Sequence, residues 1–211
     1  YNEESTRSIS WATPSGTITV QDNSSGFLTP VKGVKIRCHR FVKWSVAFTD
    51  QSGSYTMDKQ FKYKPHYAIV FENIKGFDIW GNWGPIARAN YNMGYQNNIG
   101  YSKDIDTDCL AWDWAVVNNA AYEYYQMCEA TGITPPPDNL KIWVWQYGSS
   151  APMLRRIHHP IEYNGHSPWL NYFINIGYGS TATTLNDILR YVLPDITITK
   201  QNQYRNIYNT V

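Results

Sequence analysis

The feature that most constrains the fold is a series of short segments, within residues 16–80, in which apolar and polar side chains alternate. In the segment VKIRC, one face of an extended chain carries Val34, Ile36 and Cys38, while the two residues between them are basic. Period-two segments separated by Asn, Asp, Gly and Pro are typical of half-buried β-strands joined by turns. This part of the chain therefore predicts a small antiparallel β-sandwich.

Other strands of this sandwich are expected on both sides of the VKIRC segment. They fall at residues 17–20, 45–49, 55–57 and 67–71. The last of these segments, YAIVF, is apolar on both faces, as expected of a central strand that is buried on both sides.

Three motifs in this region carry a family resemblance. They are GTITV from Gly16, PVKGVKI from Pro30, and TDQSGSY from Thr49 to Tyr55. Together they resemble carboxypeptidase regulatory-like (transthyretin-like) domains, which implies a prealbumin-like sandwich. In the last motif Gly53 allows a turn with positive φ, and Tyr55 then returns to the core. Such domains are usually accessory, so the resemblance implies a fold and no chemistry.

The domain organisation predicted from these patterns has four parts, and the fold class is α+β. Residues 1–14 are a polar tail, and residues 15–80 form the sandwich. Residues 81–104 are rich in Gly and Asn without a period, which indicates a connecting loop. Residues 105–211 form an α/β unit.

This second unit is expected to begin with an amphipathic helix. Asp104, Asp106 and Asp108 would lie at the positive end of the helix dipole, and Gly132 would end the helix. Apolar residues recur on one face, which indicates a core face rather than a cofactor site; they are Leu110, Trp114, Val117, Ala121, Tyr124 and Cys128. Cys109 and Cys128 would be too far apart on this helix to form a disulfide.

A strand at residues 140–147 supplies the candidate binding site. Leu140, Ile142 and Val144 would share one face of this strand. Its other face carries Trp143, Trp145 and Tyr147, which predict either an aromatic platform that stacks on sugars or a second buried face of the sheet.

The segment RRIHHPIEYNGH contains the candidate metal ligands His158, His159 and His166. Zinc enzymes commonly place two histidines four residues apart on a helix. Pro160 prevents a helix through this segment, and adjacent histidines on an extended chain point to opposite sides. We therefore expect loop histidines with ordinary hydrogen bonds, with an irregular loop metal site as the alternative.

The end of the sequence carries a second resemblance. A short helix from Thr184, a strand at residues 195–199 and the start of a helix at Tyr204 follow in order. The final pattern, in which Tyr204, Ile207, Tyr208, Thr210 and Val211 match a Y-x-x-I-Y-x-T-V lead-in, is similar to zincin-like zinc-metallopeptidase proteins of gut bacteria. The resemblance implies that this helix continues past Val211 into H-E-x-x-H. That motif is absent, so no catalytic residue and no cofactor are assigned here, and zinc belongs to a longer chain.

Two functions are therefore expected from the sequence. The first is the N-terminal portion of an extracytoplasmic bacterial metallopeptidase-like protein, which is not catalytic by itself. The second is a non-enzymatic surface module that binds glycan, peptide or protein through exposed aromatics. The chain has a net charge of +1, 17% charged residues, 9 Trp and 17 Tyr, and no basic run interleaved with aromatics, so nucleic acid is not an expected partner. No apolar run is long enough to cross a bilayer, and a lipid anchor upstream is compatible with the sequence.

Overall fold

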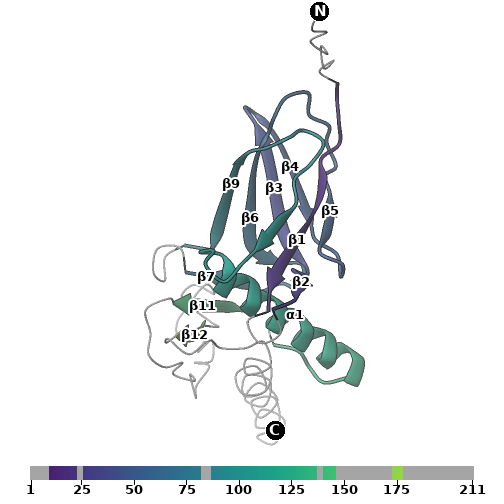
Figure 1. The fold of residues 1–211 in the computed structure, drawn as a ribbon. Coiled ribbons are helices and arrows are strands. Elements are labelled where there is room, and N and C mark those ends of the chain that lie inside the picture. The colour runs from purple at the N-terminus through teal and green to yellow at the C-terminus, as the bar shows by residue number, and fades with distance from the viewer. Residues whose placement is uncertain (1–9, 23–25, 82–86, 137–139, 146–172, 178–211) are drawn as a thin grey trace, which may run out of the picture.

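The part of the chain that the structure describes folds into two β-sheets and one long helix (Figure 1). The structure is a computed structural model, and it describes residues 10–22, 26–81, 87–136, 140–145 and 173–177. Most of the described residues lie in or between strands, which places the molecule among β-rich α+β folds.

The first sheet is built around β1 (Ser15–Gln21). Strand β10 (Lys103–Ile105) pairs with it in parallel on one side. On the other side β5 (Ser54–Thr56) pairs with its first half and β2 (Leu28–Pro30) with its second half, both antiparallel.

The second sheet has seven strands in the order β12, β11, β7, β6, β3 and β4, with β9 beside β6. Their bounds are β3 (Val34–Arg40), β4 (Lys43–Phe48), β6 (His66–Asn73), β7 (Asp78–Trp80), β9 (Asn90–Tyr95), β11 (Lys141–Trp145) and β12 (Phe173–Gly177). Strands β3, β4, β6 and β9 are antiparallel, whereas β7, β11 and β12 are parallel.

The hydrophobic core lies between the two sheets and confirms the predicted period-two faces. From β3 it takes Val34, Ile36 and Cys38, all fully buried, as the alternation predicts. The facing strand β1 contributes Ile18 and Val20. The predicted turn before β5 is also confirmed, because Gly53 adopts a φ of 75° and the Asp50 carboxylate accepts the backbone N–H groups of residues 52 and 54.

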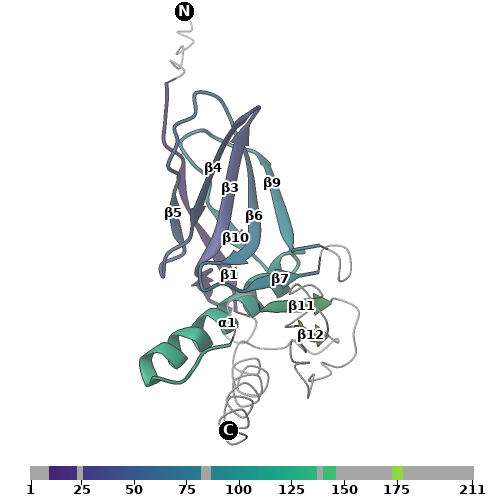
Figure 2. The same ribbon diagram turned by 180° about the vertical axis from the view of Figure 1, so that it is seen from behind.

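Helix α1 (Trp112–Thr131) lies across one end of the sandwich, as Figure 1 and Figure 2 show from opposite sides. It ends at Gly132, which is left-handed and donates its N–H to the carbonyl of Cys128, as predicted. The predicted core face is largely confirmed, since Trp114, Val117 and Ala121 are buried.

The start of this helix differs from the prediction. Asp104 belongs to β10, Asp106 and Asp108 precede the helix, and only Asp113 lies in its first turn. Leu110 also lies before the helix and is exposed. Turns at residues 106–112 separate β10 from α1, so the three aspartates do not act on the helix dipole in the way the spacing suggested.

Residues 81–104, which were predicted as a connecting loop, contain strand β9 and the first two residues of strand β10. In β9 the asparagines point away from the core while Tyr91 and Met93 pack toward it. The period-two pattern is therefore present, but Asn and Gly, which are usually turn formers, occupy its polar positions. Strand β10, which pairs in parallel with β1 in the first sheet, also begins in this segment.

The second sheet continues from the predicted sandwich into the predicted α/β unit. Strand β7 is joined to β6 through one residue pair, Glu72 with Asp78. Strand β11, predicted at residues 140–147 and observed at Lys141–Trp145, pairs in parallel with β7. Its predicted buried face is confirmed, since Leu140, Ile142 and Val144 are buried. The elements predicted at residues 184–211 lie outside the described residues.

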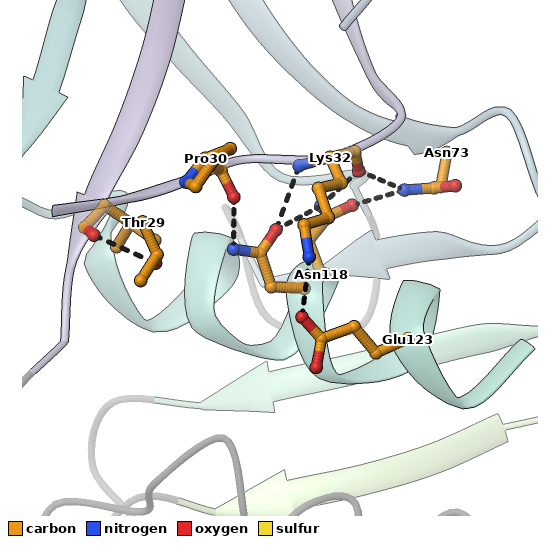
Figure 3. Close-up of polar contacts among 8 residues, drawn as sticks. Thr29, Pro30, Lys32, Asn73, Asn118 and Glu123 are labelled. Carbon is orange, nitrogen blue, oxygen red and sulfur yellow. Dashed lines mark hydrogen bonds and ion pairs between the residues drawn. The ribbon is translucent and has the colours of Figure 1, made fainter. Parts of the chain in front are cut away.

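A cluster of buried asparagines attaches α1 to the chain between β2 and β3 (Figure 3). Asn119 donates to the carbonyl of Pro30 at 2.7 Å and accepts the N–H of Lys32 at 3.0 Å. Asn118 and Asn73 both donate to the carbonyl of Lys32, each at 2.9 Å. The amides thus satisfy backbone groups that no strand pairs, and burial without partners would cost about 1–3 kcal/mol for each group.

Gly33 completes this junction because no larger residue fits there. Its φ is 68°, and a Cβ atom would lie 2.7 Å from the Tyr122 ring and 2.8 Å from the Asn73 amide oxygen. At this point α1 therefore packs directly on the backbone of Gly33.

Replacing Asn119 with Ala should lower the free energy of unfolding by about 3 kcal/mol, because a buried carbonyl and a buried N–H lose their partner. Alanine favours helix more than asparagine, so a loss cannot come from helix propensity. Denaturant unfolding measures this change in the free energy of unfolding. Glu129→Gln, which breaks an exposed ion pair with Lys75, is the matched control and should change stability by less than about 1 kcal/mol. Equal effects from the two variants would contradict the role given to Asn119.

Candidate functional site

The outer face of the second sheet carries four aromatic side chains in one row. Strand register places His39 of β3 opposite Trp44 of β4 on one side and opposite His66 of β6 on the other. His66 in turn lies opposite Tyr95 of β9. We call this row, Trp44–His39–His66–Tyr95, the aromatic ladder. The first sheet and the core lie on the other face of these strands.

Neighbouring rings of the aromatic ladder are in contact. His39 stacks on Trp44 with ring centroids 4.2 Å apart and planes 12° from parallel. The His39 and His66 centroids are 4.9 Å apart, and Tyr95 meets His66 edge to face at 5.2 Å. The two end rings are the accessible ones, with Trp44 46% and Tyr95 60% exposed. The ladder spans three strand spacings, or about 14 Å.

Two arginines flank the aromatic ladder. The guanidinium of Arg37 lies 5.6 Å from the Trp44 ring, and that of Arg40 lies 5.4 Å from the Tyr95 ring, which are cation–π distances. Arg40 also donates to the carbonyl of Lys64, which fixes its direction. Lys59 adds a third cation nearby, because its Nζ donates to the Trp44 carbonyl at 2.8 Å.

The electrostatics of this face are positive. Three cations, Arg37, Arg40 and Lys59, lie beside the aromatic ladder. Burial, together with the charges of His66 and Arg37, lowers the pKa of His39 below its ordinary value of 6.5. Burial and the neighbouring positive charges therefore disfavour the protonated form of His39. An anion bound here would favour that form.

The edges of the two imidazoles are what a ligand can reach. Each ring is partly covered by its neighbours on both sides. Nδ1 of His39 and Nδ1 of His66 are buried and make no hydrogen bond within the described residues. Of the two nitrogens of each ring, Nδ1 is therefore closed to a ligand, and a hydrogen bond to a ligand would have to use Nε2.

A second charged group lies further along the same face and is structural. Glu72 pairs with Lys35 and Arg88, and Arg88 also donates to Asp78 at 2.8 Å. Burial raises the pKa of Asp78, and the hydrogen bond and charge of Arg88 oppose that rise. These ion pairs join β6, β7 and the segment before β9, where only one residue pair links β6 to β7.

The site residues predicted from sequence are only partly described. Trp143 and Trp145 lie in β11, but their side chains and the whole of Tyr147 lie outside the described residues. His158, His159 and His166 lie outside them as well. Among the residues that the structure does describe, no three His, Cys, Asp or Glu side chains are placed to share a metal ion. Within the same residues, no helix has the length and apolar character to span a bilayer.

The aromatic ladder itself was missed from sequence. Each of its members occupies a polar position of a period-two segment. Such a position shows that the side chain lies on the solvent face of its strand, but it does not show which side chains of other strands lie beside it. Only the register of four strands, two of them far apart in the chain, brings the rings together. The available signal was the unusual presence of Trp44 and His39 at such positions close to a hairpin.

Comparisons with known proteins do not assign the chain to a family. No protein-family model matches it, and no curated protein matches it by sequence. A search of solved structures finds the crystal structure of (S)-allantoin synthase at 18% identity, with a TM-score of 0.24. That alignment covers 46% of this chain and 42% of the synthase, so it spans less than half of either protein and carries no argument about function.

The lowered pKa of His39 predicts the direction of a pH effect. Below pH 6.5 the unfolded chain takes up a proton at His39 more readily than the folded chain. The free energy of unfolding should therefore fall as the pH falls from 6.5 through the folded-state pKa. An NMR titration should place the His39 midpoint below 6.5, and His39→Gln should lose less stability over this range than the wild type. A midpoint at or above 6.5 would contradict the arrangement.

Proposed function

We propose that this chain is a non-enzymatic binding module that holds an acidic glycan on the aromatic ladder. The observation that carries the proposal is the row of four rings flanked by Arg37 and Arg40 on an exposed sheet face. Guanidinium groups recognise carboxylate and sulfate oxygens in a planar, bidentate manner. An acidic glycan presents such groups at intervals along a chain of sugar rings.

The arrangement of the rings favours a glycan over a single-stranded nucleic acid. Nucleic bases bind to proteins by stacking on open aromatic faces. Here the faces of His39 and His66 are turned toward neighbouring rings, so the middle of the ladder offers edges and hydrogen-bonding nitrogens. Only the end rings, Trp44 and Tyr95, are open enough to stack on the apolar face of a sugar. A ligand that alternates apolar faces with oxygen anions suits this order.

The charge of the ladder predicts how binding depends on pH. An anion beside His39 favours its protonated form, which the free protein disfavours. Affinity for an acidic glycan should therefore rise as the pH falls, while a neutral glycan would bind independently of His39. This distinction separates recognition of charge from recognition of sugar faces alone.

The metallopeptidase-like function stays a prediction, because its supporting residues lie at the end of the sequence. It is compatible with the module proposed here, since an accessory sandwich can bind a surface polymer beside a catalytic domain. The extracytoplasmic location is likewise a proposal, and it suits a glycan ligand.

Trp44→Ala and Arg37→Gln should each weaken binding to heparin or to a polyuronate by about tenfold or more, because the first removes an accessible stacking ring and the second removes a guanidinium group that would pair with an anion. Phe27→Ala removes an exposed aromatic near β2, in the first sheet, and is the matched control. Isothermal titration at about pH 7.5 and about pH 5.5 measures the affinities, and the wild type should bind more tightly at the lower pH.

Three results would overturn the proposal. They are the absence of wild-type binding to either acidic polymer, an equal affinity for neutral dextran, and an equal loss with Phe27→Ala. Tighter binding to single-stranded DNA that depends on Trp44 would instead assign the ladder to nucleic acid.

A further inference from the structure

The turn of the β3–β4 hairpin lies at the end of the sandwich opposite α1 (Figure 1 and Figure 2). Phe41 is 82% exposed and Val42 is 94% exposed. Two more exposed aromatics lie at this end. The first is Trp11, whose ring lies 4.8 Å from Nζ of Lys43. The second is Tyr63, which precedes Lys64, the residue whose carbonyl accepts a hydrogen bond from Arg40. We call these residues, with the cations among them, the tip surface.

Phe41 is the first residue of the two-residue turn between β3 and β4, a position at which tight hairpins require a positive φ. Its φ is 51°, and it is the only non-glycine residue with a positive φ among the described residues. A bulky side chain is an outlier in this region, where Gly or Asn is accommodated more easily. The turn therefore accounts for the φ of Phe41 and not for its phenyl ring, which is exposed at a position where glycine would be less strained, and this choice of residue points to a contact outside the protein.

Three cations of the tip surface each lie beside one of its aromatic rings. Arg40 lies 5.1 Å from the Phe41 ring, Lys43 lies 4.8 Å from the Trp11 ring and Lys62 lies 5.8 Å from the Tyr63 ring. The nearest carboxylate along the chain, Asp58, accepts a hydrogen bond from Ser45. The occupant of this surface must therefore be apolar at its centre and anionic around it.

We propose that the tip surface contacts a bilayer that carries anionic lipids, with Phe41 and Val42 inserted among the headgroups. A protein partner would need about 800 Å² of complementary surface on each side, and two side chains on a hairpin turn provide far less. Membrane contact needs only a small apolar wedge, because clustered Lys and Arg add attraction to an anionic surface. A second copy of this chain is unfavourable, since the same cations would face one another.

The insertion proposed here is independent of glycan binding on the aromatic ladder. The ladder lies on the face of the sheet, whereas the tip surface lies at the turn between β3 and β4. Variants can therefore separate the two functions, although Arg40 belongs to both.

Vesicle co-sedimentation of the full chain tests the proposal. The wild type should sediment with vesicles of equal parts phosphatidylcholine and phosphatidylglycerol and not with phosphatidylcholine alone, and salt should weaken the binding. Phe41→Ser with Val42→Ser should weaken it at least about tenfold, because both inserted side chains are lost. Phe41→Gly should also weaken it without loss of thermal stability, since glycine relieves the strained φ. Ile74→Ser, at the exposed turn near α1, is the matched control and should bind as the wild type does.

The proposal is overturned if the wild type fails to bind the mixed vesicles or binds both kinds equally. It is also overturned if the double variant binds the mixed vesicles as well as the wild type. If the wild type and the double variant are both retained on immobilised polyglutamate and neither binds vesicles, the tip surface contacts an acidic protein instead. Trp44→Ala should leave vesicle binding intact, which separates this contact from the glycan site.

Discussion

Two adjacent asparagines on α1 hold together the parts of this molecule that no β-ladder connects. Where β2 ends at Pro30 and the chain passes Lys32 toward β3, the carbonyl of Pro30 and the backbone N–H and carbonyl of Lys32 face the helix. Asn118 and Asn119 supply the missing partners, and Asn73 adds a third amide from β6. This polar contact fixes the depth and direction of a helix that apolar packing alone would leave free to slide.

The position of the helix has consequences at both ends of the sandwich. At the near end, α1 closes the core between the sheets and leads into β11, which extends the second sheet through β7. The far end lacks such a cover among the described elements. There β3 and β4 turn sharply with Phe41 and Val42 in solvent, and the outer face of the same strands presents the aromatic ladder. The stable end and the surfaces proposed to bind are thus separate.

Much of this fold could be predicted from the sequence, because local alternation reports which side of a strand is buried. The inner faces of β3 and β11, the turn at Gly53 and the helix end at Gly132 were all predicted in this way. Strand β9 was not, because its polar positions are asparagines, which also form turns. The aromatic ladder could not be predicted at all, since it depends on the register between β6 and β9 and not on any one segment.

The hydrogen bond from Lys59 to the carbonyl of Trp44 has a further consequence. Strand β4 is an edge of the second sheet, and its outward backbone groups could accept a strand from another copy of the protein. Lys59 occupies one of those carbonyls and places a positive charge beside the edge. The exposed side chains of Trp44 and Val46 on this strand would otherwise favour edge-to-edge association. The lysine therefore lowers the tendency of this edge to pair with a further strand.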